Sequence, residues 1–132
     1  MDTRELIKSA SELVPKLQSR AQLTEDLRQI PQDTVRDILA SGIYKIGIPR
    51  LYGGHSVNYG VCLDVGEELA KGCGSAAWCY SLWTAHAYLI GHWPLAAQEE
   101  VFGDAKYPLC SSSLNPGRSE IRSVDGGYKL SG

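Results

Sequence analysis

The sequence predicts a mainly α-helical fold that is followed by the first strands of a β-domain. Apolar residues recur at helical spacing along most of residues 2–102, whereas short β-type runs between glycine-containing turns occupy the end of the chain. The composition, with 43% apolar and 21% charged residues, is typical of a globular protein with a core. We therefore expect a helical domain over residues 1–104 and the truncated beginning of a β-domain over residues 105–132.

The first two helices are predicted from apolar spacing and from their boundary residues. Residues 2–20 carry one apolar stripe, formed by Leu6, Ala10, Leu13 and Leu17. Pro15 lies inside this pattern and is expected to bend or divide the helix, because proline removes a backbone donor. The second helix lies between Pro31 and Gly42, with Val35, Ile38 and Leu39 facing inward.

A packed connector and a third helix are expected next. Pro49, Gly53 and Gly54 break any helical pattern within residues 43–60. The third helix is predicted over residues 58–71, capped by Asn58 or Ser56. Its buried face should contain four residues at helical spacing: Val61, Cys62, Val65 and Leu69.

The fourth predicted helix, residues 75–93, is the most unusual element because all three tryptophans lie on it. One stripe along this helix contains Trp78, Leu82, His86, Leu89 and Trp93. A short fifth helix is predicted over residues 95–102, with Gln98, Glu99 and Glu100 exposed.

The end of the chain changes to β-type sequence. Runs at residues 109–113, 119–124 and 128–132 are expected to form strands, separated by turns at residues 115–117 and 125–127. The Asp-Gly-Gly turn favours a hairpin, because glycine tolerates the positive φ that tight turns require. So few strands leave open edges and are marginally stable, which predicts a fragment of a longer polypeptide or a sheet completed by another chain.

Several classes of function are disfavoured by composition. The net charge of -2 and the lack of a basic cluster argue against nucleic-acid binding. The four cysteines form no C-x-x-C pair and no signal segment follows Met1, so we expect reduced thiols in the cytoplasm. His86 and His92 are six residues apart and would lie on different helix faces, which predicts no metal site. The uncharged stretch after Lys71 contains glycine, serine and proline, and so favours a buried helix over a membrane span.

Four short segments, in order, resemble motifs of the acyl-CoA dehydrogenase-like flavoprotein superfamily. They are Gly42 to Pro49, Tyr52-Gly53-Gly54, Glu68-Leu69-Ala70, and Cys73 to Trp78. The resemblance covers most of the chain. It implies the superfamily's N-terminal helical domain, followed by the first strands of its β-barrel middle domain.

Two further features resemble one branch of that superfamily, the oxygenase components of two-component phenol hydroxylases. The segment from Ser111 to Gly117 replaces the Thr-Glu-Pro and Gly-Ser-Asp sequences typical of the dehydrogenases, and Trp78 precedes His86 by eight residues. The resemblance implies that His86 is catalytic and that Ser112, Trp78 and Trp83 line the substrate pocket. It also implies that Ser111, Ser113 and Leu114 contact the flavin.

The reaction implied by this resemblance is the hydroxylation of a phenol. Reduced flavin, FMN or FAD, would arrive from a separate reductase and react with O2, and one oxygen atom would be added ortho to the phenol hydroxyl. An imidazole changes charge near neutral pH, so His86 could accept the phenolic proton. The resemblance also implies a homo-oligomer, a tetramer in that family, and little activity for the 132-residue chain alone.

Other interpretations remain open from the residues alone. The same fold also serves acyl-CoA dehydrogenases and sulfur- or nitrogen-oxidising relatives, and the chain could instead be a truncated, non-catalytic helical interaction module. His86 could be a core histidine satisfied by a backbone carbonyl, and the three serines could be plain strand residues. For His55 and His92 we expect a structural or surface role, and for Trp78, Trp83 and Tyr88 a place mainly in the core.

Overall fold

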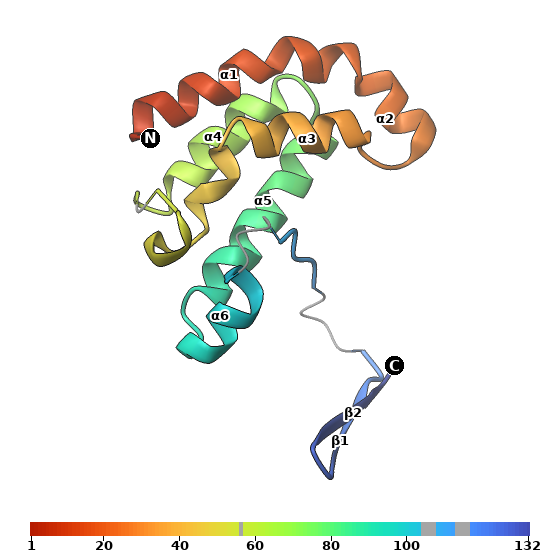
Figure 1. Cartoon of the computed structure of the whole chain (residues 1–132). Coiled ribbons are helices and arrows are strands. Elements are labelled where there is room, and N and C mark those ends of the chain that lie inside the picture. The colour runs from red at the N-terminus through yellow and green to blue at the C-terminus, as the bar shows by residue number, and fades with distance from the viewer. Residues whose placement is uncertain (56, 104–107, 113–116) are drawn as a thin grey trace.

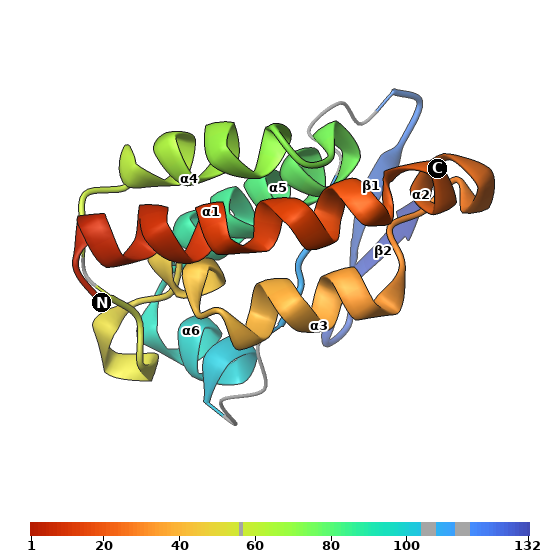
Figure 2. The ribbon, with the colours of Figure 1, turned by 90° about the horizontal axis from the view of Figure 1, so that it is seen from above.

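The fold is a body of packed helices from which a β-hairpin extends, as Figure 1 shows. The structure, a computed structural model, describes residues 1–55, 57–103, 108–112 and 117–132. Seen from above in Figure 2, helix α1 (Thr3–Ser19) lies between α4 (Val61–Ala70) and α3 (Gln32–Ala40). Helix α4 in turn packs on α5 (Gly74–Ile90), the helix that carries Trp78, Trp83 and His86.

Helix α1 forms where its sequence predicts a helix. The Asp2 carboxylate accepts a hydrogen bond from the backbone N–H of Glu5 at 2.9 Å, and the Glu5 carboxylate accepts one from Asp2 N–H at 2.7 Å, which completes a capping box. The predicted stripe is buried. The helix is continuous through Pro15 and is not divided there, because buried leucines on both sides hold the two halves on the same core.

Helix α2 (Ala21–Leu27) was not predicted, and α3 differs slightly from its prediction. Helix α2 is only seven residues long and ends at Arg28 in the left-handed conformation, φ 52°. In α3, Ile38 is buried as expected, but Thr34 takes the second fully buried position, whereas Val35 and Leu39 are half-buried.

The contact between α1 and α3 includes an ion pair that should make the free energy of unfolding depend on pH. Arg20 donates to the Asp37 carboxylate at 2.8 Å and Lys16 approaches it at 3.4 Å. The hydrogen bond from Arg20, helped by Lys16, lowers the pKa of Asp37 below its usual value of 3.8. Because the folded protein holds this carboxyl in its ionised form, the ion pair stabilises the fold at pH values above the pKa of Asp37 in the unfolded chain. The stabilisation is lost as the pH falls through the lower pKa of the folded protein.

We therefore predict that Asp37→Asn lowers the free energy of unfolding at neutral pH by about 1 kcal/mol, as expected for a half-buried ion pair. Urea unfolding of the wild-type and variant chains, measured at several pH values, checks this. The difference should shrink towards zero once the pH is well below 3.8. A difference that does not change with pH would contradict the ionic origin.

The connector consists of two short 3-10 helices and a Gly-Gly turn. Helix η1 (Ile43–Ile46) buries most of its side chains, and η2 (Arg50–Tyr52) leads into Gly53. Gly53 has a φ of 86°, a conformation that glycine adopts without a steric penalty. A Cβ on Gly54 would lie 1.6 Å from the carbonyl oxygen of Ile48, so this position needs glycine for a different reason, the close approach of two backbones.

Helices α4 and α5 are shorter than predicted. Helix α4 begins at Val61 with Gly60 as its N-cap, and Asn58 accepts a hydrogen bond from Gly60 N–H at 2.8 Å in the turn that precedes the helix. Ser56 lies outside the described residues. The four residues expected on the inner face of α4 are all buried. Helix α5 ends at Ile90, three residues before the predicted end.

On α5, the expectation that Trp78 lies mainly in the core is wrong. The residues that pack inward are mostly small: Ala76, Ala77, Tyr80, Thr84, Ala87 and Ile90. Most residues of the stripe named from the sequence lie on the outer side: Trp78 is 68% exposed, and Trp93, which follows the helix, is 53% exposed. Small residues face inward because α5 approaches its neighbours closely: a Cβ on Gly47 of the connector would lie 2.4 Å from the carbonyl oxygen of Thr84.

Two clusters of buried residues form the core. The larger one joins α1, α3, α4 and the first half of α5. The smaller one lies between η1, the second half of α5 and α6 (Leu95–Phe102), and consists of Tyr44, Ile48, Ala87, Ile90 and Phe102. Helix α6 has the predicted bounds, although Gln98 is buried because its amide donates to the Trp93 carbonyl oxygen at 2.7 Å.

The predicted hairpin is present. Strands β1 (Glu120–Val124) and β2 (Gly127–Ser131) pair antiparallel, with Val124 opposite Gly127, and Gly126 has a φ of 81° in the turn. All side chains of both strands are exposed. The strand expected over residues 109–113 is not formed within its described part, residues 109–112, which have no strand partner there.

Candidate functional site

The segment of residues 108–112 lies against the second half of α5, where it forms the candidate site. Tyr44, fully buried in η1, donates a hydrogen bond from its hydroxyl to the carbonyl oxygen of Pro108. The thiol of Cys110 is 3.7 Å from the same oxygen, and Cys110 packs against the smaller core cluster. Burial raises the pKa of the Tyr44 hydroxyl and of the Cys110 thiol, so both remain protonated at neutral pH.

His86 joins α5 to this segment through both ring nitrogens. Its Nδ1 is 3.1 Å from the carbonyl oxygen of Cys110, and its Nε2 is 2.7 Å from the hydroxyl oxygen of Ser112. A carbonyl oxygen only accepts hydrogen bonds, so Nδ1 is the nitrogen that carries the proton in the neutral ring. Nε2 is then an acceptor, and the Ser112 hydroxyl donates to it.

A small pocket of about 200 Å³ opens beside this pair. Apart from the imidazole and the two serines, its lining is apolar or weakly polar: Leu89, Ile90, Trp93 and Cys110. This volume suits one aromatic ring and is below the range usual for pockets that enclose drug-sized ligands. The arrangement can therefore hold a small ring in an apolar pocket, with a proton acceptor at one side.

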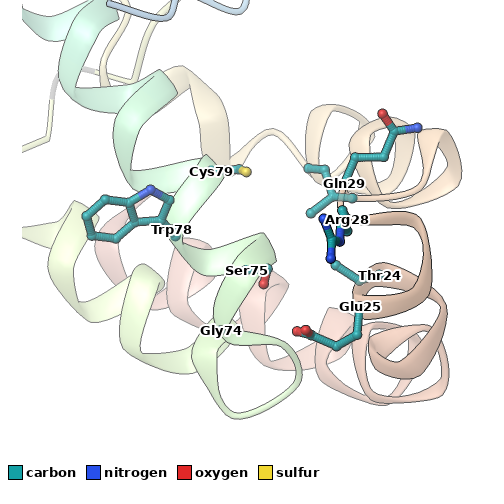
Figure 3. Close-up of a pocket in the computed structure, with 9 residues that line it drawn as sticks. Thr24, Glu25, Arg28, Gln29, Gly74, Ser75, Trp78 and Cys79 are labelled. Atoms are coloured by element: carbon teal, nitrogen blue, oxygen red, sulfur yellow. The ribbon is translucent and has the colours of Figure 1, made fainter. Parts of the chain in front are cut away.

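Two other residues expected at this site lie elsewhere. Trp78 is eight residues before His86, about 12 Å along the helix. Figure 3 shows Trp78 at the N-terminal end of α5, where it lines a different hollow, of about 510 Å³, that faces Glu25 and Arg28 of the α2 region. Trp83 is half-buried and packs against both core clusters. The His86 pocket has neither tryptophan among its lining residues.

The predicted flavin contacts are only partly described. Ser111 lines the His86 pocket and is exposed. Ser113 and Leu114 lie outside the described residues. The serine segment and His86 therefore meet, as the sequence interpretation required, although two of the three proposed flavin contacts have no structural description.

The other two histidines, His55 and His92, form hydrogen bonds away from the His86 pocket. His55 holds the carbonyl oxygen of Gly42 at 2.9 Å through Nε2, and its Nδ1 is 3.4 Å from the N-terminal ammonium group. His92 is exposed and contacts the Tyr88 carbonyl oxygen at 2.8 Å through Nδ1. All four cysteines are free thiols. In the described part of the chain, no three His, Cys, Asp or Glu side chains converge as a metal site, and no helix has the length and apolarity that a membrane span needs.

Three contributors to the site were missed by sequence reasoning: the Tyr44 hydroxyl and the carbonyl groups of Pro108 and Cys110. Two of them are backbone groups, which no residue pattern reveals. Tyr44 belongs to the Gly42 to Pro49 motif, but a tyrosine in an apolar run is as typical of a core position as of a hydrogen-bonding one. Leu89 and Trp93, in contrast, were predicted beside His86 and do line its pocket.

The second half of α5 forms one wall of the small pocket, and the segment of residues 108–112 forms the opposite wall. The family model "Acyl-CoA dehydrogenase, N-terminal domain" matches residues 2–102. The chain therefore belongs to the family of acyl-CoA dehydrogenase N-terminal domains. The family expected from the sequence motifs is thus confirmed.

Similar proteins come from the oxygenase branch. The chain is 32% identical, over 99% of its length, to the flavin-dependent monooxygenase, oxygenase subunit HsaA of Mycobacterium tuberculosis (strain CDC 1551 / Oshkosh), and covers 33% of that protein. It is 31% identical, over 86% of its length, to the oxygenase component of the FADH(2)-dependent resorcinol hydroxylase of Rhizobium sp. (strain MTP-10005), and covers 28% of it. The crystal structure of the HsaA monooxygenase from M. tuberculosis superimposes with a TM-score of 0.93 over the whole chain and 36% of that structure. The chain therefore spans about a third of the length of these relatives.

Proposed function

We propose that this chain forms the helical wall of the substrate pocket in a flavin-dependent monooxygenase that hydroxylates a phenolic ring. The observation that carries the proposal is the contact between His86 Nε2 and the Ser112 hydroxyl at 2.7 Å, at the edge of an apolar pocket sized for one ring. Similarity to the oxygenase subunits named above supports the choice of reaction.

The residues of this chain suit a specific task, the removal of a proton from a phenol. A phenol hydroxyl that enters the pocket meets the Ser112 oxygen and, beyond it, the lone pair of His86 Nε2. Transfer of the phenolic proton towards the imidazole leaves a phenolate, whose ortho carbon is a better nucleophile. Leu89, Ile90 and Trp93 exclude water from the reacting ring.

The flavin is assigned to the serine side of the pocket. A pocket of about 200 Å³ cannot enclose a flavin as well as a phenol, but Ser111 is exposed at its edge, which fits a flavin lying against the outer side of the segment. We propose Ser111, together with Ser113 and Leu114, as flavin contacts. Reduced flavin, FMN or FAD, would supply the activation of O2.

The remaining parts of the system are proposed from the similarity. They are a separate reductase that delivers the reduced flavin, a homo-oligomeric assembly, a tetramer by family resemblance, and a location in the reducing cytoplasm, where the four thiols would stay free. We also propose the division of the chain into a helical domain, residues 1–104, and the start of a β-domain, residues 105–132.

The test is an assay of the full-length oxygenase that contains this chain. The enzyme is supplied with enzymatically reduced FAD or FMN, labelled ¹⁸O2 and a panel of simple phenols, and the products are examined by mass spectrometry. We expect an ortho-dihydroxylated product with one labelled oxygen. A parallel assay supplies oxidised flavin and acyl thioesters. Oxidation of a thioester there, with no labelled product from the phenols, would instead favour the dehydrogenase interpretation.

A further prediction concerns the 132-residue chain alone. We expect no measurable hydroxylation when it is mixed with a flavin reductase, NADH and phenols, because a pocket of about 200 Å³ does not enclose a flavin and the chain spans about a third of the relatives' length. The same assay with the full-length enzyme is the positive control. Turnover by the chain alone, above the rate of free reduced flavin, would contradict this prediction.

A further inference from the structure

We propose that Tyr44 is a positioning residue that fixes the tautomer of His86 through the segment of residues 108–112. The proposal rests on two hydrogen bonds that are two residues apart along this segment. Tyr44 donates to the carbonyl oxygen of Pro108, and His86 Nδ1 donates to the carbonyl oxygen of Cys110. The catalytic use of this tautomer rests on the proposed function. The tautomer itself follows from the hydrogen bonds alone.

The Cys110 carbonyl decides which ring nitrogen carries the proton. With the proton on Nδ1, both nitrogens have complementary partners: Nδ1–H faces a carbonyl oxygen and the Nε2 lone pair faces a hydroxyl. With the proton on Nε2, that N–H could still reach the Ser112 oxygen, but the Nδ1 lone pair would face the lone pairs of the carbonyl. The Ser112 hydroxyl accepts and donates equally well, so only the carbonyl discriminates between the two tautomers.

The position of the Cys110 carbonyl depends in turn on Tyr44. Residues 109–112 have no strand partner among the described residues, so the backbone ladder of a sheet does not hold them there. The Tyr44 hydroxyl instead joins the segment to η1 across 64 positions of the sequence. Tyr44 is itself fully buried in the smaller core cluster, so its ring cannot follow movements of the segment.

Tyr44 remains suited to this role over the pH range in which an imidazole titrates. Burial raises the pKa of its hydroxyl, so it stays a neutral donor at neutral pH and below. The consequence is that the proton-accepting nitrogen, Nε2, faces Ser112 and the pocket whenever the ring is neutral. The opposite tautomer would present an N–H to the pocket and could not accept a proton there.

The tautomer can be measured directly in this chain by ¹⁵N NMR of the histidine rings at a pH where they are neutral. We expect His86 as the Nδ1–H tautomer. The other two histidines are internal references: His92 also directs Nδ1 at a carbonyl, whereas His55 directs Nε2 at one and should show the opposite pattern. Finding His86 as the Nε2–H tautomer, while both references behave as expected, would overturn the proposal.

A matched pair of variants isolates the Tyr44 hydroxyl. In Tyr44→Phe we expect the single-tautomer pattern of His86 to be lost and replaced by a mixture, with His55 and His92 unchanged. Tyr80→Phe is the control, since Tyr80 is equally buried but its hydroxyl has no hydrogen-bond partner among the described residues. An unchanged His86 pattern in Tyr44→Phe, or the same change in both variants, would refute the role of Tyr44.

A third variant, Ser112→Ala, keeps the proposal testable if Tyr44→Phe does not fold. It removes the partner of Nε2 and leaves the carbonyl side intact, so His86 should retain the Nδ1–H tautomer. A change of tautomer would mean that Ser112, and not the Tyr44-anchored carbonyl, decides the protonation. None of these measurements uses flavin, O2 or a phenol, so failure of the hydroxylase proposal would be recognised separately in the labelled-oxygen assay.

Discussion

Replacing His86 with alanine lowers the rate of phenol hydroxylation in the full-length oxygenase by about two to four orders of magnitude, the usual contribution of a positioned acid-base group. The variant loses the acceptor for the phenolic proton, and Ser112 loses its 2.7 Å partner. Oxidation of reduced flavin by O2 should continue, so the loss should appear as uncoupling: hydrogen peroxide forms in place of hydroxylated product. Both products are measured in one assay at a saturating phenol concentration.

The control for this experiment is His92→Ala. His92 follows the same helix, but it is exposed, and its ring contacts the carbonyl oxygen and the ring of Tyr88. Its replacement should leave the ratio of product to peroxide within about twofold of the wild-type ratio, as is usual for a surface substitution. If His86→Ala retains wild-type coupling and rate, the imidazole is a structural link between α5 and the serine segment, and the proposed proton transfer is wrong.

Replacing Gly47 with alanine lowers the free energy of unfolding by about 3 kcal/mol, the upper part of the range for overpacked positions. The added methyl group would lie 2.4 Å from the carbonyl oxygen of Thr84 and 3.1 Å from its side chain, so η1 and α5 must separate. The nearest atoms to the added methyl group are the backbone carbonyl oxygen and carbon of Thr84, so no flexible side chain can move aside to relieve the clash. Urea unfolding followed by tryptophan fluorescence measures the change.

Gly74→Ala is the matched control for Gly47→Ala. Gly74 is the first residue of α5, and a Cβ there would meet no atom within 4 Å. Alanine has the higher helix propensity, so the variant should be as stable as wild type or more stable by up to about 1 kcal/mol. Equal destabilisation by the two substitutions would show that the effect of Gly47→Ala does not come from the close approach of Gly47 to Thr84.

The family and most of the helices could be predicted from local sequence. Helix α6 has the predicted bounds, the inner faces of α1 and α4 are correct, and the Asp-Gly-Gly hairpin is present. These successes share one cause, since each element has a clear polar and apolar side or a turn residue with a fixed backbone requirement. Helix α2 was missed because seven residues are too short for a periodic pattern to be recognised.

The inner face of α5 could not be predicted in the same way. This helix carries apolar residues on all sides, so periodicity does not distinguish the face that packs from the face that is exposed. The choice was made by the close approach of Gly47 to Thr84, which only small residues allow, and it turned Trp78 outward. A prediction that gives large aromatic residues to the core is wrong wherever backbones approach this closely.

By itself, the sequence determined the helical architecture, the hairpin, the superfamily and the two residue types, imidazole and serine, expected at the site. Only the tertiary structure decided that His86 meets Ser112 and Cys110 at opposite nitrogens, that Tyr44 anchors their segment, and that Trp78 lies at a separate hollow. The physical reason is that local patterns record the preferences of neighbouring residues along one element. Hydrogen bonds across 24, 26 and 64 positions depend on how the elements pack, and two of these three end on backbone carbonyls, which every residue possesses.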